Sequence, residues 1–285
     1  MYTTFKNIIV THSFHDMKTA LKYGMIALIG FAAGIAFEYW FLTAIWPNRH
    51  QSYSWVYTLR NHRKPGEPCD TDLVLDRLGY SLGYSYKYKS ALWVSYILSS
   101  GSVNINVGRH GSFYADTNIP EEYRVQPEQH RNTEYDKGHL APSASIDFSK
   151  KANRETFALS NIVPQAPKLN RQAWQELESL ERKWAKTRGK IYVVTGPIYP
   201  SNPRTVNDLP IPSKFYKVLY SYKADKAIGF IMPNKEVQDK NLWRYAKSVQ
   251  EVEQETELIF FSKFRQKTQH TLKEQIDKEW WRNEH

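Results

Sequence analysis

Cysteine is almost absent from this sequence: Cys69 is the only one among 285 residues. One thiol cannot form an intrachain disulfide or supply a cysteine-based zinc site, so a disulfide scaffold and a zinc finger are both excluded. Any metal site must therefore use oxygen and imidazole ligands. Acidic residues are fewer than basic ones, with 29 Asp and Glu against 39 Lys and Arg and a formal net charge of +10. This excess favours a polyanionic partner, either nucleic acid or an anionic membrane surface.

The sequence contains no internal repeat and no low-complexity tract. Hydrophobic residues make up 41% of the chain and aromatic residues 14%. That composition is sufficient to bury a substantial core, which excludes a disordered chain. One compact domain is the expectation for most of the length.

Only one long apolar run is present, from Tyr23 to Trp46, with Glu38 inside it and Pro47 after it. It is long enough to cross a bilayer if Glu38 lies near the headgroups among the Tyr and Trp side chains. We interpret residues 23–46 as a transmembrane anchor after an N-terminal flank of residues 1–22. A cleaved signal peptide and a buried core helix are the two alternatives. Because large domains translocate regardless of charge, we expect the domain on the non-cytosolic side.

The remaining sequence suggests a linker over residues 47–70, which is rich in Pro and charge, and a domain over residues 71–285. Expected strands cover residues 92–98, 190–197, 215–220 and 227–232, the last two as a hairpin. Expected helices cover residues 170–187, 240–252 and 271–281. Strands and helices that come in separate runs indicate an α+β fold.

The densest cluster of reactive residue types is Tyr-Asp-Lys-Gly-His-Leu-Ala-Pro-Ser at residues 135–143. Gly138 allows a sharp turn just before His139. A histidine on such a turn can face a groove while a backbone carbonyl holds its second ring nitrogen, as a general base requires. The chain has 9 histidines, so a lone histidine would be read as structural, but other segments accompany His139.

Those segments are Leu-Ser-Asn-Ile-Val-Pro-Gln at residues 159–165 and Asn-Arg-Gln-Ala-Trp-Gln-Glu-Leu-Glu at residues 170–178. Asn170 opens the expected helix, either as its cap or as a metal ligand through the amide oxygen. Glu178 lies about 12 Å farther along an α-helix, too far for both to bind one ion directly. Glu178 and Arg182 are four residues apart, so they share one face of the helix and could form a surface salt bridge. Alternatively, Glu178 could orient a metal-bound water and Arg182 could contact a phosphate.

Together the residues resemble the DNA/RNA non-specific endonucleases of the endonuclease G type. The family motifs are Asp-Arg-Gly-His with Ala-Pro, then Ser-Asn-x-x-Pro-Gln, then Asn-x-x-x-Trp-x-x-Leu-Glu. All three occur here in order, and the similarity extends over roughly residues 75–262. Three spaced motifs are far more specific than one. The departure is Lys137 in place of the usual Arg, which keeps the charge but loses the bidentate fork that suits a phosphate.

The resemblance implies a ββα-metal nuclease fold, with a central antiparallel sheet flanked by helices. It implies that His139 is the general base, that Asn170 is the sole direct protein ligand of Mg²⁺, and that Mn²⁺ can substitute. It further implies that Glu178 holds a metal-bound water and that Lys137 and Arg182 act on the phosphate. Substrate contacts would come from Arg154, Asn161 and Gln165, although hydrogen bonding within the fold explains the last two equally well.

The expected activity is therefore hydrolysis of phosphodiester bonds in DNA and RNA by a Mg²⁺-dependent endonuclease. Because His139 must be neutral, we expect the rate to fall as the pH is lowered from about 8 to about 5. Two alternatives are an exonuclease of the same fold and an inactive membrane-anchored nucleic-acid-binding protein, which Lys137 alone supports. The family also allows a homodimer. With the anchor, the location would be the bacterial periplasm or the mitochondrial intermembrane space.

Overall fold

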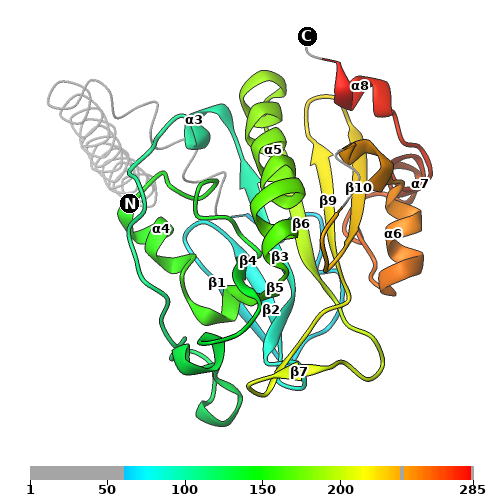
Figure 1. The fold of residues 1–285 in the computed structure, drawn as a ribbon. Helices are drawn as coiled ribbons and strands as arrows, with labels where there is room; N and C mark the ends of the chain where they lie inside the picture. The colour runs from blue at the N-terminus through cyan, green and yellow to red at the C-terminus, as the bar shows by residue number, and fades with distance from the viewer. Residues whose placement is uncertain (1–60, 238–240, 284–285) are drawn as a thin grey trace, which may run out of the picture. The chain divides into compact units, whose positions relative to one another are not determined.

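A seven-stranded antiparallel sheet lies at the centre of the structure, a computed structural model that describes residues 61–237 and 241–283 (Figure 1). Every neighbouring pair of its strands is antiparallel. In spatial order the strands are β1 (Leu73–Asp76), β2 (Ser81–Ser85), β3 (Ser90–Leu98), β6 (Ile191–Ile198), β9 (Lys214–Ser221), β10 (Lys226–Pro233) and β11 (Ala246–Lys247). These residues all belong to one compact unit, Trp55–His285.

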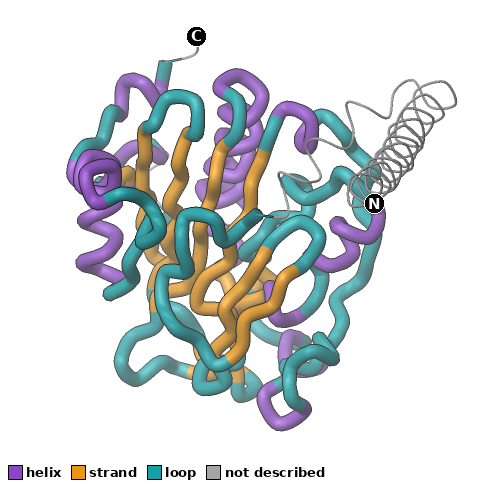
Figure 2. The backbone as a smooth tube through the Cα atoms, turned by 180° about the vertical axis from the view of Figure 1, so that it is seen from behind, coloured by secondary structure: helices purple, strands orange, loops and turns teal. Residues whose placement is uncertain are grey.

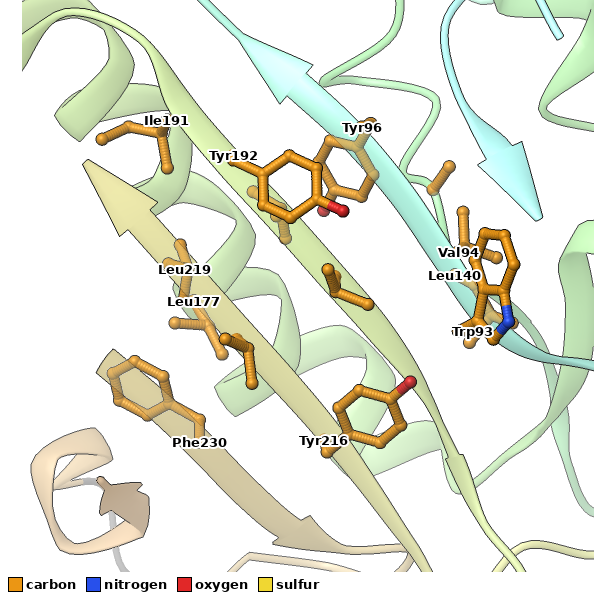
Figure 3. Packing of buried hydrophobic residues seen from close by; sticks show 14 of the residues in the cluster. Trp93, Val94, Tyr96, Leu140, Leu177, Ile191, Tyr192, Tyr216, Leu219 and Phe230 are labelled. Carbon is orange, nitrogen blue, oxygen red and sulfur yellow. The ribbon is translucent and has the colours of Figure 1, made fainter. Parts of the chain in front are cut away.

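Both faces of the central strands are covered, which explains their nearly continuous runs of apolar residues. On one face Tyr96 and Leu219 lie beside Leu177 of helix α5 (Gln175–Arg188) (Figure 3). On the opposite face the ring nitrogen of Trp93 donates a hydrogen bond to the carbonyl of Cys69 at 3.3 Å. A strand with such alternate contacts has two buried faces, as in the core of a layered α+β domain.

The layer that carries α5 also contains a two-stranded ribbon of β4 (Asp136–His139) and β5 (Ile162–Gln165). The π-helix η4 (Leu169–Trp174) runs directly into α5, and Figure 1 shows α5 lying across the sheet. The remaining helices are α3 (Ser100–Val103), α4 (Lys150–Glu155), α6 (Val249–Thr256), α7 (Gln266–Glu274) and α8 (Lys278–Arg282). Short 3₁₀ turns are η1 (Glu121–Tyr123), η2 (Pro127–His130), η3 (Leu159–Asn161) and η5 (Leu242–Tyr245), and a small hairpin is formed by β7 (Thr205–Val206) and β8 (Leu209–Pro210).

Residues 61–70 are part of the domain, although their composition suggests a linker. The carbonyl of Pro68 accepts a hydrogen bond from the amide of Ile259 at 2.9 Å, and that of Pro65 accepts one from Lys263 at 3.1 Å. Loops cross the sheet on this side (Figure 2). Proline and glycine therefore mark an irregular backbone here that is nevertheless held by tertiary hydrogen bonds.

The four expected strands and their hairpin are confirmed as β3, β6, β9 and β10. The helix expected over residues 170–187 is also confirmed, with a π-helical first part. The helix expected over residues 240–252 is wrong, because Ser248 and Glu251 form a capping box that starts α6 only at Val249. The helix expected over residues 271–281 is two helices, since the side chain of Asp277 caps α8 through the amide of Trp280.

The flank 1–22, the proposed anchor 23–46 and the first part of the linker lie outside the described residues. Among residues 61–237 and 241–283, no helix combines the length and the apolar character needed to span a bilayer.

The buried histidines predict a loss of stability in acid. Burial lowers the pKa of His62 to about 4 from 6.5, so the unfolded chain binds a proton that the folded chain resists. The contribution of His62 to the free energy of unfolding is fully present above about pH 6.5. It falls by up to about 3 kcal/mol as the pH drops towards 4. His62→Leu should flatten the change in unfolding free energy between about pH 7.5 and pH 4.5, measured by urea titration.

His270→Leu is the matched control, because the His270 side chain is 72% exposed. The explanation fails if both variants keep the acid sensitivity of the wild type.

Candidate active site

His139 is the last residue of β4 and its ring packs between two phenylalanines. The ring centroids lie 5.4 Å from Phe113 and 5.1 Å from Phe157, the second at an interplanar angle of 89°. Nε2 of His139 is buried and has no hydrogen-bond partner among the described residues. Aromatic packing rather than a backbone carbonyl therefore orients this ring, which corrects the expected carbonyl contact. Gly138 lies inside the strand, opposite Val163, and not at a sharp turn.

Burial, with a smaller contribution from the positive charge of Arg109, lowers the pKa of His139 to about 3. The imidazole is accordingly neutral throughout the range from pH 5 to 8. Apolar surroundings disfavour the imidazolium form, so a pKa near 3 would place any loss of rate through protonation of His139 below pH 5. The expected decline of the rate between pH 8 and pH 5 stays a prediction. The residue is thus in the protonation state that a general base requires.

Two cationic side chains lie over the same aromatic pair. The guanidinium carbon of Arg109 is 4.7 Å from the ring centroid of Phe157, and Nζ of Lys137 is 5.0 Å from that of Phe113. Both contacts have cation–π geometry. Arg109 is missing from the sequence expectations because it lies thirty positions before His139 in a loop without periodicity, and only the folded chain brings the two together.

Asp136 connects the His139 strand to the Asn170 helix. Its Oδ2 accepts hydrogen bonds from Nδ2 of Asn170 at 2.9 Å and from Nε of Arg171 at 2.8 Å. Its Oδ1 accepts a second bond from Arg171 at 2.6 Å. The amide nitrogen of Asn170 is therefore occupied, which leaves the amide oxygen available. Helix capping is not the role of Asn170, because the cap position of η4 is Lys168.

The π-helical hydrogen bonding of η4 alters the geometry between Asn170 and Glu178. A π turn closes over five residues instead of four, so the chain advances less along the axis than in an α-helix. The separation of about 12 Å derived for a regular α-helix is an overestimate for this segment. π-helical turns of this kind are frequent at functional sites.

Glu178 and Arg182 lie half-buried on α5 and do not form a salt bridge with each other. Burial raises the pKa of Glu178 to about 7, Lys217 and Arg182 oppose that change, and Glu181 adds to it. Arg182 instead donates hydrogen bonds to Oγ of Ser145 at 3.3 Å and to Oγ of Ser179 at 3.0 Å. The simple surface pair is thus not formed, and the Glu178 carboxylate accepts no hydrogen bond from the described residues.

Asn161 is fully buried and its amide bonds only to the backbone. Its Nδ2 donates to the carbonyls of Ala141 and Thr156 at 3.0 and 2.8 Å, and its Oδ1 accepts from the amide of Ala141 at 2.8 Å. This geometry favours the structural interpretation of Asn161. Arg154 is exposed at the end of α4, and no contact with His139 or Asn170 connects it to the other candidates.

Gln165 is almost fully buried, and both polar atoms of its side chain lack a partner among the described residues. The side chain lies across Gly138: a Cβ atom placed there would be 2.4 Å from Oε1 and 2.6 Å from Cβ of Gln165. Only glycine at position 138 leaves room for the Gln165 side chain.

The sequence model of the DNA/RNA non-specific endonuclease family matches residues 60–267. The chain belongs to this family. A nuclease from Syncephalastrum racemosum is 31% identical over 226 residues, which cover 70% of this chain and 71% of that protein. The mitochondrial endonuclease G of Bos taurus is 31% identical over 203 residues, which cover 65% of this chain and 67% of that protein.

A solved structure described as the EndoG/EndoGI complex has the same fold, with a TM-score of 0.67 and 30% identity. The alignment covers 73% of this chain and 92% of that one. The resemblance to the endonuclease G type and the expected α+β fold with a flanked antiparallel sheet are thereby confirmed. In this nuclease family member, the paired strands β4 and β5 and the η4–α5 helix carry most of the candidate residues. Arg154 lies on α4 and Asn161 in η3.

Gly138→Ala should destabilise this nuclease and lower its activity, because the added methyl group would overlap Gln165. Overpacking of this kind costs about 1–3 kcal/mol. Replacing Gln165 with Gly removes both overlapping atoms, so Gly138→Ala/Gln165→Gly should lose less stability than the two single changes added together. Urea unfolding of the four proteins measures this coupling. Strict additivity would show that the two side chains do not compete for space.

Proposed function

We propose that this chain is a Mg²⁺-dependent endonuclease that hydrolyses phosphodiester bonds in both DNA and RNA. The observation that carries the proposal is the Asp136 contact: the strand that ends in His139 holds the amide of Asn170 at 2.9 Å. The neutral imidazole of His139 and the free amide oxygen of Asn170 are thus both positioned by the Asp136 segment. Family membership indicates nuclease activity, and this geometry supports the roles proposed for the two residues.

The residues present fit a magnesium ion. The oxygen of Asn170 is left over by the Asp136 contact, and the Glu178 carboxylate lies on the continuing helix without a hydrogen-bond donor. Oxygen donors and few protein ligands suit Mg²⁺, which retains most of its water, and Mn²⁺ tolerates the same donors. Bound through Asn170, the ion would supply stabilisation of the charge that develops on the phosphate and the leaving oxygen.

The chain's own groups divide the remaining work. His139 takes the proton from the attacking water through an imidazole that stays neutral near pH 7. Arg109, Lys137 and Arg182 supply positive charge for the phosphate, and a lysine at position 137 offers a point charge where a bidentate fork is usual. Gln165 is a further candidate for substrate contact, since its buried amide has no partner. Asn161 supports the end of β4, and Arg154 remains a peripheral phosphate contact in this proposal.

Charge contacts with the backbone give binding that depends on salt and little on base sequence. DNA and RNA are therefore equivalent partners in this proposal. Residues 23–46 would anchor the chain in a membrane with the nuclease domain on the non-cytosolic side, in the bacterial periplasm or the mitochondrial intermembrane space. Self-association into a homodimer completes the proposal.

The direct test uses the full-length chain with supercoiled circular DNA and with RNA, with Mg²⁺ and with chelator. We expect metal-dependent nicking of the circle and cleavage of the RNA, and a loss of about 10²–10⁴-fold in His139→Ala because the general base is removed. His270→Ala, at an exposed histidine, is the control and should match the wild type.

The substrates separate the alternatives. A circle has no ends, so cleavage of linear DNA alone would indicate an exonuclease. Binding of DNA without cleavage in either Mg²⁺ or Mn²⁺ would support the inactive binding protein and contradict the proposed activity.

Asp136→Ala tests the metal assignment. It frees the amide of Asn170 to rotate, so the Mg²⁺ concentration for half-maximal cleavage should rise about 10–100-fold, as for other groups that orient a metal ligand. The control is Glu236→Ala, which removes the exposed ion pair with Lys168 in the same region. An unchanged Mg²⁺ requirement in Asp136→Ala would count against Asn170 as the ligand.

A further inference from the structure

A lysine lies in the middle of the sheet, where its ammonium group is completely shielded from water. Lys217 of β9 and Glu181 of α5 are both 0% exposed, and Nζ of Lys217 lies 2.9 Å from Oε2 of Glu181. Nζ also donates to the hydroxyl of Tyr96 on β3 at 3.1 Å. That hydroxyl donates in turn to the Glu181 carboxylate at 3.0 Å. These hydrogen bonds among Lys217, Tyr96 and Glu181 thus join strands β9 and β3 to helix α5.

The same carboxylate reaches Arg182. Ser145 is fully buried, and its Oγ donates to Oε1 of Glu181 at 2.9 Å. Oγ of Ser145 also accepts a hydrogen bond from Nη1 of Arg182 at 3.3 Å. A continuous chain of hydrogen bonds therefore runs from Lys217 through Glu181 and Ser145 to the guanidinium of Arg182.

A second connection leads to the segment that carries Asn170. Nζ of Lys217 lies 5.0 Å from the ring centroid of Trp174, within cation–π range. Trp174 is the last residue of η4, four positions after Asn170, and it is buried. Lys217 consequently contacts both parts of the helix: the π-helical turn with Asn170 and, through Glu181, the α-helical turn with Arg182.

Stability alone does not account for this arrangement. Removing two charges from water costs several kcal/mol per ion, and apolar residues of similar volume are often equally or more stabilising. A buried polar network with all its members bonded does fix side-chain orientation, because each group has a single set of partners. Lys217 and Glu181 of this network also act electrostatically on Glu178, the first favouring and the second opposing its charged form.

We propose that Lys217, Glu181, Tyr96 and Ser145 form a positioning network for the active site. It holds the guanidinium of Arg182 in place and fixes the π-helical turn of Asn170 relative to α5. The inference rests on the proposed function, since it gives these residues a role in the same reaction. None of the four touches the substrate, so each acts through Arg182, Trp174 or the electrostatic surroundings of Glu178.

The decisive variant is Glu181→Leu/Lys217→Met, which removes both charges together and leaves no uncompensated buried ion. We expect kcat for plasmid cleavage to fall at least about tenfold, corresponding to about 1.4 kcal/mol in the barrier. KM should stay within about threefold, because Arg109 and Lys137, the other two cationic groups proposed for the phosphate, are unchanged. The thermal midpoint should be unchanged or raised.

Ile228→Val is the matched control, a conservative change at a fully buried residue of β10. It tests whether any small loss of packing in this sheet lowers kcat. A double variant that keeps the wild-type kcat, or one whose kcat falls no more than that of the control at equal loss of thermal midpoint, would overturn the proposal.

Single changes decide the matter if the double variant does not fold. Ser145→Ala breaks only the connection from Glu181 to Arg182, so it should lower kcat with little effect on KM. Ser145→Thr keeps the hydroxyl and should restore part of the loss. Equal activity of wild type and Ser145→Ala would overturn the proposal.

The activity of the wild type distinguishes a failure of this inference from a failure of the proposed function. If the wild-type chain does not cleave nucleic acid, both proposals are contradicted. An active wild type that requires His139, together with fully active network variants, would remove the positioning role alone.

Discussion

The Asp136 carboxylate is the contact on which the candidate site depends. It lies at the start of β4 and bonds to Asn170 and Arg171, which belong to a helix more than thirty residues later in the chain. β-Pairing fixes the distance from Asp136 to His139, and the hydrogen bonds fix the distance from Asp136 to Asn170. The base and the candidate metal-binding oxygen are therefore held by a strand and a helix rather than by loops, which limits how far they can move apart.

His139 illustrates how a nonpolar environment can set a protonation state without a hydrogen bond. Phe113 and Phe157 pack against the ring and reduce its contact with water, and the cation of Arg109 makes a second positive charge unfavourable. Burial shifts the pKa of Glu178 in the opposite direction, upwards. The cause is the same, because a nonpolar environment favours the neutral form of a carboxyl group as well as that of an imidazole. The two groups thus both respond to the same low polarity.

Local sequence patterns predicted the parts of the fold that depend on local physics. Strands such as β3 and the β9–β10 hairpin have apolar runs with a polar turn between them, and the motif residues His139, Asn170 and Glu178 are recognisable from their spacing. Arg109 was not predicted, because its approach to His139 depends on the course of an irregular loop. The Lys217–Glu181 pair was not predicted either, since a lysine in a strand normally indicates an exposed position and only the α5 packing buries it.

The hydrogen bonds that the carbonyls of Pro65 and Pro68 accept from the amides of Lys263 and Ile259 have a consequence for biosynthesis. They join parts of the chain that are almost two hundred residues apart. The face of the sheet that carries Trp93 and Tyr216 is covered in part by Phe260, whose ring meets that of Tyr216 edge to face with the centroids 5.8 Å apart. A nascent chain that still lacks this segment exposes aromatic surface while it emerges from the ribosome, and such surface promotes aggregation. Completion of this domain is thus delayed until the chain has been synthesised beyond Lys263.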